Sequence, residues 1–220
     1  MISLLAVSNY RSLKETRLPL GRLNLVTGAN GSGKSNLYKA LRLLSDTALG
    51  TATSSIAAEG GLDSVLWAGP ETISRAMKKG QLPVQGGPRQ KPVELKLGFV
   101  GDDFSYAIDF GMPEPVPGTM FFKDPVIKRE AIWYGGQYHP SRLMVDRRGP
   151  VIKARNQSGA WQVIDHHLHS FDSMLMRLAD PHLAPEALFL RESIRSWRFY
   201  DHFRTDRFSP VREPHVATRT

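Results

Sequence analysis

Alternating apolar and polar positions are clearest in the middle of the chain. In residues 93–99 and 104–110, apolar side chains occupy every second position, the period of a strand with one buried face. The turn residues 101–103 lie between the two runs, so the pattern predicts a β-hairpin. Further strands are predicted at residues 127–134, 142–146, 151–155 and 160–164, separated by turns that contain Gly or Asn. We therefore expect an antiparallel meander over this part of the chain.

A helical period appears closer to the N-terminus. Leu37, Ala40, Leu41 and Leu44 are spaced i, i+3, i+4, i+7 and predict a helix that begins near Ser32 and ends between residues 44 and 47. Ahead of it we predict a buried strand at residues 2–7, a second strand at 17–20 and a short apolar strand at 23–27. Two more helices are expected, from residue 170 or 171 to 178 and from about Pro185, where Ala187, Leu190, Ile194 and Trp197 share a face.

The remaining segments have weaker patterns. Residues 47–92 are rich in Gly, Ser, Thr, Ala and Pro and are expected to be irregular, with short helical pieces at 62–67 and 71–79. Residues 198–203 are a candidate for a returning strand. We divide the chain into a core at 1–46, an irregular insertion at 47–92, a β meander at 93–165, a helical segment at 166–204 and a loose linker at 205–220.

Composition and charge exclude few classes of protein function. The chain has 220 residues, 41% of them hydrophobic and 23% charged, which is ordinary for a globular protein. Its net charge of +8 and pI near 9.9 agree with contact to nucleic acid but are weak evidence for it. There is no cysteine, which excludes disulfides and thiolate metal sites. Residues 1–7 lack a basic leader and no apolar run approaches membrane-spanning length, so we expect a soluble cytoplasmic protein.

The strongest chemical signal is the run Gly-Ala-Asn-Gly-Ser-Gly-Lys-Ser at residues 28–35. It fits the phosphate-binding loop pattern G-x-x-x-x-G-K-[S/T] and lies between a predicted strand and a predicted helix, where that loop belongs. Glycines allow the tight turn that points successive N–H groups at phosphates, and the helix N-terminus adds a positive dipole end. The alternative is a glycine-rich turn that merely starts a helix.

Each position of the loop has an expected role. Lys34 is the candidate catalytic residue and is expected to reach the β- and γ-phosphates of ATP, while the Ser35 hydroxyl is the candidate Mg²⁺ ligand. The predicted nucleotide-binding residues in and next to the loop are Gly28, Asn30, Gly31, Ser32, Gly33, Lys34, Ser35 and Asn36.

The residues around the loop resemble a particular group of ATPases. Asn9-Tyr10-Arg11-Ser12-Leu13, the run from Leu23 to Leu37, the run from Ala40 to Leu44 and residues 195–203 are similar to the SMC/RecF branch of the ABC-type ATPases. The likeness is strongest to the bacterial RecF-like AAA family ATPases of DNA repair and phage defence. It covers about the first 45 residues closely and the remainder in layout.

This resemblance implies a fold and a set of partners. The fold would be α/β, the N-terminal lobe of a P-loop NTPase of the ABC/SMC head type, with an antiparallel β subdomain and C-terminal helices. The full-length protein would hydrolyse ATP in a homodimer that sandwiches ATP between its heads, coupled to DNA or to a defence-effector protein, with no membrane involved. Arg11 would contact the nucleotide phosphates, the alternative being an exposed arginine at a strand end. Tyr10 is expected in the core rather than near the base.

Two motifs of that branch have no counterpart in the sequence. Neither a Ser-Gly-Gly signature nor a strand of four apolar residues ending in Asp-Glu occurs; residues 107–110 and 163–166 are only imitations of the latter. We therefore expect the chain to be the N-terminal part of a longer ATPase, which alone binds nucleotide weakly or not at all and turns over negligible ATP. A Mg²⁺-sensing glutamine is not assigned by the sequence, and Gln137 and Gln162 are two candidates for it. The other functions that the sequence allows are a non-hydrolytic nucleotide-dependent interaction module and a P-loop small-molecule kinase.

Two further clusters have competing interpretations. The run His166, His167 and His169, near Asp172, suggests a metal site or a group of exposed and capping histidines. The basic pairs 78–79 and 147–148 are candidates for contact with DNA phosphates or for solvated turns.

Overall fold

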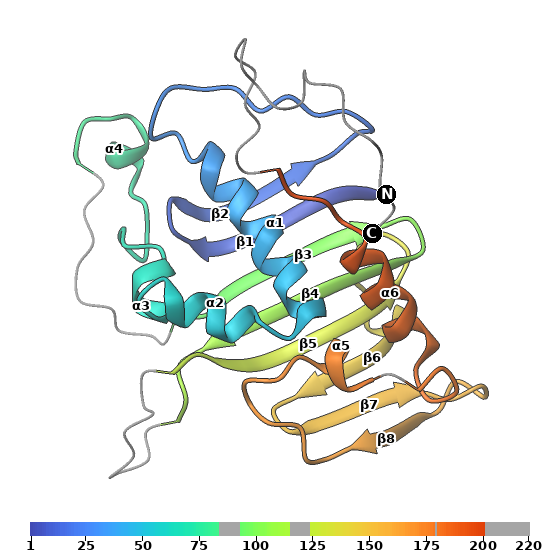
Figure 1. Ribbon diagram of the computed structural model, residues 1–220. Coiled ribbons are helices and arrows are strands. Elements are labelled where there is room, and N and C mark those ends of the chain that lie inside the picture. Colours follow the sequence, from blue (N-terminus) through green and yellow to red (C-terminus); the bar gives the residue numbers. More distant parts are fainter. Residues whose placement is uncertain (84–92, 115–123, 179, 201–220) are drawn as a thin grey trace, which may run out of the picture.

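The sheet is the framework of the molecule. The computed structural model describes residues 1–83, 93–114, 124–178 and 180–200. In these residues, eight strands form one antiparallel sheet in the order β2-β1-β3-β4-β5-β6-β7-β8 (Figure 1). The strands are β1 (Ile2–Tyr10), β2 (Leu13–Pro19), β3 (Leu95–Gly101), β4 (Phe104–Gly111), β5 (Val126–Tyr134), β6 (Leu143–Arg148), β7 (Val151–Arg155) and β8 (Trp161–Asp165). The predicted hairpin and meander are confirmed, and β1 joins them to the N-terminal segment in a single sheet.

Strand register explains why one face of the sheet is buried. Leu5 on β1 is paired with Phe99, which is paired in turn with Tyr106. The same row continues through Ile132 and Val145 to Ala154, whose partner on β8 is the exposed Gln162. The six side chains before Gln162 in this row are buried. Since side chains alternate between faces along a strand, the apolar period that predicted the strands also assigns this face to the core.

Helices cover that apolar face (Figure 1). They are α1 (Lys34–Leu49), α2 (Ala52–Ala58), α3 (Leu62–Val65), α5 (Met174–Arg177) and α6 (Pro185–Arg195). A short helix, α4 (Arg75–Lys78), lies to one side and has no buried residue, and a 3-10 turn spans Pro140–Arg142. The predicted apolar stripe of α1 is confirmed, because Ala40 and Leu44 are fully buried and Leu37 and Leu41 pack against the core. The molecule is thus a mixed α/β structure with one helical layer on an antiparallel sheet.

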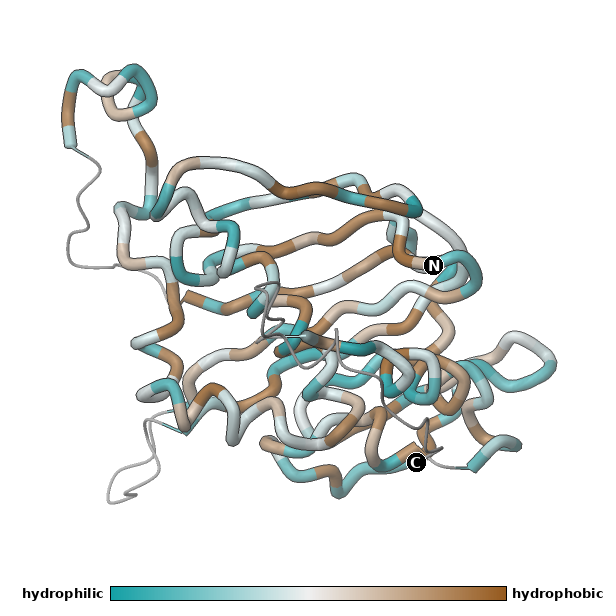
Figure 2. The backbone as a smooth tube through the Cα atoms, turned by 45° about the horizontal axis from the view of Figure 1, so that its top comes forward, coloured by the Kyte–Doolittle hydropathy of each residue, from teal (hydrophilic) through white to brown (hydrophobic). Residues whose placement is uncertain are grey.

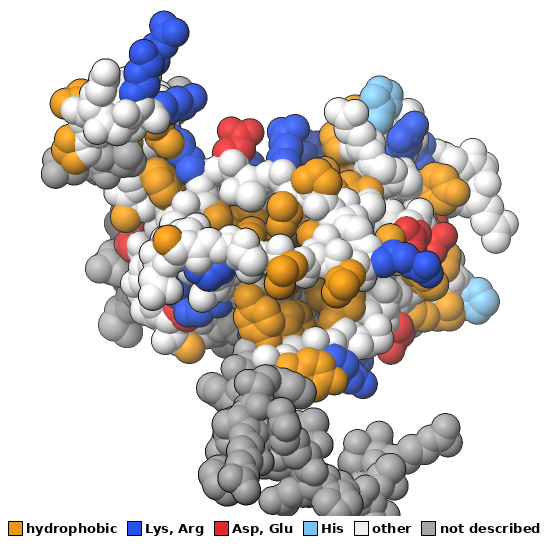
Figure 3. Space-filling model, turned by 90° about the horizontal axis from the view of Figure 1, so that it is seen from above, with side chains coloured by type: hydrophobic (Ala, Val, Ile, Leu, Met, Phe, Trp, Pro, Cys, Tyr) orange, Lys and Arg blue, Asp and Glu red, His pale blue; other side chains and the backbone are white. Residues whose placement is uncertain are grey.

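The predicted strand at residues 23–27 is wrong. These residues form no strand, and the side chains of Leu23 and Leu25 are 92% and 88% exposed. A strand needs a hydrogen-bonded neighbour, and no described strand pairs with this segment. Figure 2 shows it as a brown stretch along the top of the molecule, and Figure 3 shows hydrophobic side chains gathered in the middle of the face seen from above.

Other boundaries also differ from the sequence prediction. Helix α1 continues to Leu49, where Gly50 ends it at a φ of +73°. Helix α2 lies in the region expected to be irregular and is anchored by Ile56, which is buried. Residues 198–200 form no strand, and residues 201–203 lie outside the described residues, as does the predicted linker at 205–220. Among the described helices, none combines the length and the apolar character needed to cross a bilayer.

A buried ion pair ties the helical layer to the sheet. Arg147 Nη1 donates to Glu130 Oε2 over 2.6 Å, and both side chains are fully buried. Glu130 also accepts from the hydroxyls of Tyr106 and Ser173 and from the backbone N–H of Met174, which starts α5. Arg147 is therefore part of the core, and its prediction as a DNA-contacting or solvated residue is wrong.

Candidate nucleotide-binding site

The glycine loop lies between β2 and the N-terminus of α1. Residues 21–32 are exposed, and the helix behind them is anchored in the core. Gly33 occupies the N-cap in a left-handed conformation and provides no side-chain hydrogen bond. The first N–H groups of α1 therefore keep their capacity for an external acceptor, which makes this end of the helix attractive to an anion.

Three glycines determine the course of the loop. Gly31 and Gly33 adopt φ angles of +81° and +96°, which side chains with a Cβ rarely adopt, and Gly28 has a φ of +154°. A Cβ on Gly33 would lie 2.7 Å from the hydroxyl of Ser12, and one on Gly28 would lie 2.8 Å from that of Ser32. The backbone conformation thus favours glycine at these positions, and at Gly28 and Gly33 a Cβ would also displace a serine hydroxyl, which fits a backbone cradle for phosphate.

Lys34 folds back over this cradle. Its Nζ donates to the carbonyl of Gly28 over 2.6 Å and to that of Ala29 over 2.7 Å. The ammonium group is therefore held at the loop itself, within reach of any anion bound by the loop amides. The role of Lys34 in neutralising phosphate charge stays a prediction.

The turn between β1 and β2 supports the loop from below. Ser12 in this turn accepts a hydrogen bond from Asn36 Nδ2 over 2.8 Å, and it approaches Gly33 closely. Asn36 is thus turned toward the supporting turn and fixes the first turn of α1. Ser35 is exposed at the mouth of the loop, where its hydroxyl is accessible to a Mg²⁺ ion, and Asn30 is exposed as well.

Arg11 is engaged by a carboxylate outside the loop. Its Nη2 forms an ion pair with Glu59 Oε2, at the end of α2, and its guanidinium lies 5.7 Å from the centroid of the Tyr10 ring. Glu59 Oε1 is in turn 3.6 Å from Lys39 Nζ on α1. Partial burial disfavours the charged form of Arg11, but interactions with Glu59 and Tyr10 outweigh this and raise its pKa. Arg11 thus stays charged, held by an internal carboxylate.

Tyr10 belongs to the core, as expected. It is 2% exposed, and its backbone forms an isolated bridge with Leu66. Burial is the main cause that raises the pKa of its hydroxyl, and the charge of Glu59 adds to it. A stacking role against a nucleotide base is not open to a ring enclosed in this way.

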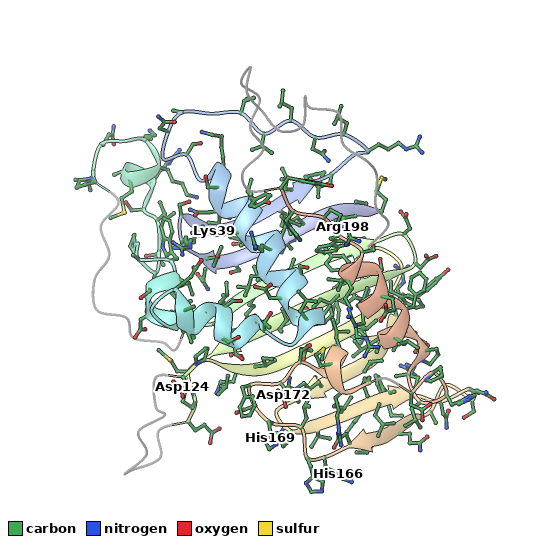
Figure 4. The ribbon with its side chains drawn as sticks, viewed as in Figure 1. Lys39, Asp124, His166, His169, Asp172 and Arg198 are labelled. Atoms are coloured by element: carbon green, nitrogen blue, oxygen red, sulfur yellow. The ribbon has the colours of Figure 1, made fainter. Side chains whose placement is uncertain are left out.

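The histidine run is not gathered into a metal centre. Among the described residues, no group of three His, Asp or Glu side chains is arranged to hold a metal ion. His169 instead stacks on the ring of Phe171, with ring centroids 5.2 Å apart. Figure 4 shows His166 and His169 at the opposite end of the molecule from Lys39.

The other sequence candidates also lie apart from the loop. Gln162 is on β8, at the far edge of the sheet from β1 and β2. Gln137 lines a hollow of about 960 Å³ on the opposite face of the sheet, whose lining includes no loop residue. Lys78 and Lys79 are exposed at the end of α4, as a solvated turn would be.

Sequence reasoning missed Glu59 and Lys39. Lys39 was findable, because it lies four residues after Ser35 and so on the same side of α1. Glu59 carried no local signal, because 48 residues separate it from Arg11 and only the packing of α2 brings them together.

A comparison with known families finds a match in the N-terminal part of the chain. Residues 1–85 match the family model described as an AAA ATPase domain. The match covers the glycine loop, Arg11 and Glu59, and it supports an AAA-type ATPase family with ATP as the ligand, typically together with Mg²⁺. No curated protein matches the chain.

Proposed function

We propose that this chain, whose first 85 residues match an AAA ATPase domain, is the ATP-binding part of a RecF/SMC-like ATPase. The observation that carries the proposal is the glycine loop, whose positive φ angles favour glycine and which lies at the uncapped N-terminus of a helix anchored in the core. A backbone cradle of this kind concentrates N–H donors and a positive dipole end where phosphate oxygens would lie.

We expect different residues of the loop to bind different parts of the Mg·ATP ligand. The amides around Gly31 and Gly33 would bind the α- and β-phosphates, and the Lys34 ammonium would exchange the carbonyls of Gly28 and Ala29 for phosphate oxygens. The Ser35 hydroxyl would be a ligand of Mg²⁺, which neutralises phosphate charge when bound. Catalysis in such a site rests on positioning and electrostatic stabilisation.

We further propose that a complete site needs polypeptide beyond these 220 residues. The support is twofold: the sequence has no Asp-Glu strand or Ser-Gly-Gly signature, and the apolar segment 23–27 has no strand beside it in the described structure. The missing elements would complete an ATP-sandwiched dimer of heads, coupled to DNA maintenance or phage defence. The chain alone would then bind ATP weakly and hydrolyse it at a negligible rate.

Binding and turnover test these two proposals separately. Titration with a fluorescent ATP analogue, competed with Mg·ATP at up to millimolar concentration, should give weak binding that Lys34→Ala reduces by about tenfold or more. Lys153→Ala removes the same charge from β7, on the far half of the sheet, and should change affinity by less than about twofold. No binding by the folded wild-type chain would contradict the nucleotide site. Turnover typical of complete ATPases, about 1 s⁻¹ or faster, that depends on Lys34 would contradict the incomplete site.

A further inference from the structure

Glu59 is held firmly at the end of α2. It follows the last turn of α2, where its N–H donates to the carbonyls of Ser55 and Ile56, and Gly60 and Gly61 then turn the chain at positive φ. Ile56 anchors α2 in the core. The backbone that carries the Glu59 side chain is therefore fixed by hydrogen bonds and by the packing of α2.

Two cations that border the loop converge on this carboxylate. Arg11 pairs with Oε2 of Glu59, while Lys39 lies 3.6 Å from Oε1. Arg11 directly precedes Ser12, which contacts Gly33 of the loop, and Lys39 lies one helical turn after Ser35. Glu59 thus binds two cations that are close in sequence to residues of the loop or to residues that contact it.

The pairing of Arg11 is incomplete. Its Nε is buried and has no hydrogen-bond partner, although its backbone is fixed at a φ of +51° and its N–H is bound to the carbonyl of Val65. A buried donor without an acceptor is unfavourable, and guanidinium groups are best satisfied by two parallel acceptor oxygens. A phosphate group offers such oxygens with more negative charge than one carboxylate.

We propose that Glu59 competes internally with the nucleotide phosphates for Arg11. In the nucleotide-free protein, Glu59 holds Arg11 against α2; on nucleotide binding, Arg11 leaves Glu59 for a phosphate oxygen, and Lys39 is released with it. Glu59 thus lowers nucleotide affinity and favours release. This inference rests on the proposed ATP-binding function of the loop.

The test is the ATP competition titration with Glu59→Gln, which keeps the shape of the side chain and removes its charge. The Arg11–Glu59 pair is partly exposed, so we expect affinity to rise by about threefold to fivefold. The matched control is Glu15→Gln on β2, which removes a carboxylate that is 75% exposed and pairs only loosely with Arg17; its affinity should match the wild type. In an Arg11→Ala background, Glu59→Gln should change affinity by less than about 1.5-fold.

The outcomes separate this inference from the function on which it rests. If neither the folded wild type nor Glu59→Gln binds ATP, the proposed nucleotide site and this inference both fail. If the wild type binds and Glu59→Gln leaves affinity unchanged or lowers it, only the competition fails. A gain that persists in full without Arg11 would also overturn it, because general electrostatics would then explain the effect. Urea unfolding of each variant establishes that it is folded.

Discussion

The buried ion pair predicts a large and specific loss of stability in Arg147→Met. The substitution keeps most of the volume of the side chain and removes its charge and its donors. In the folded protein, Nε donates to the carbonyl of Gly149 over 2.9 Å, Nη2 donates to that of His169 over 2.9 Å, and Nη1 donates to that of Asp172 and to Glu130. The variant would leave the Glu130 carboxylate buried without its counter-charge.

The magnitude follows from the full burial of both partners. Removing one partner of a buried pair typically costs about 3–5 kcal/mol, because the other charge stays desolvated. Glu130 keeps three donors, from Tyr106, Ser173 and Met174, which places the expected loss toward the lower end, at about 3 kcal/mol. For a domain of typical stability this is a fifth to more than half of the total, about 5–15 kcal/mol.

The neighbouring residue offers a matched control. Arg148 has a side chain that is 71% exposed and pairs with Asp146 at the surface. Arg148→Met should therefore change the free energy of unfolding by less than about 1 kcal/mol. Urea unfolding, followed by the fluorescence of the buried Trp133, gives both values, and hydrogen exchange at the start of α5 should show local loss of protection in Arg147→Met only.

The comparison of the two variants tests whether the buried ion pair stabilises the protein. If Arg147→Met were within about 1 kcal/mol of Arg148→Met, the claim that this buried pair fastens α5 to the sheet would be refuted. If Arg147→Met is unfolded even without urea while Arg148→Met is folded, the result supports the role of the buried pair in fastening α5 to the sheet.

Two further predictions concern the loop and the pH dependence of stability. Gly31→Ala should cost about 1–2 kcal/mol from its positive φ alone, and Gly33→Ala should cost more and abolish ATP binding, because its Cβ would also meet a serine hydroxyl; urea unfolding and the titration check both. The backbone N–H of His167 and the guanidinium of Arg177 lower the pKa of Asp165, so its contribution to stability is present above about pH 4 and is lost as the pH falls through the folded-state value. The difference in unfolding free energy between wild type and Asp165→Asn should accordingly shrink below about pH 4, and a difference that grows there would show the opposite sign.

Much of the fold was predictable because its order is local. The predicted strand at 151–155 coincides with β7, and the i, i+3, i+4, i+7 stripe of α1 is buried as expected. Both patterns are properties of a few consecutive residues that must present one face to a core.

The errors in the sequence prediction arose where contacts between distant parts of the chain determine the structure. The apolar alternation of residues 23–27 is the same whether or not a neighbouring strand exists, so the sequence could not reveal that the segment is unpaired here. Arg147 and Arg148 look alike in sequence, yet the carboxylate of Glu130 on the neighbouring strand draws only the first into the core.

The residues of the candidate site show the same difference between local and distant signals. The glycines and Lys34 could be proposed from their spacing, because the loop is continuous in sequence and its conformation favours glycine. The carboxylate that binds Arg11 was not, because Glu59 reaches it only through the packing of α2.

Backbone NMR during a Mg·ATP titration tests most directly whether residues 28–36 hold a Mg²⁺-bound nucleoside triphosphate. We expect saturable amide shifts concentrated at Gly31, Gly33 and Lys34 and absent from β8, and we expect Lys34→Ala to abolish them. Saturable shifts that cluster elsewhere, or none in a folded wild-type chain at millimolar Mg·ATP, would contradict this nucleotide site.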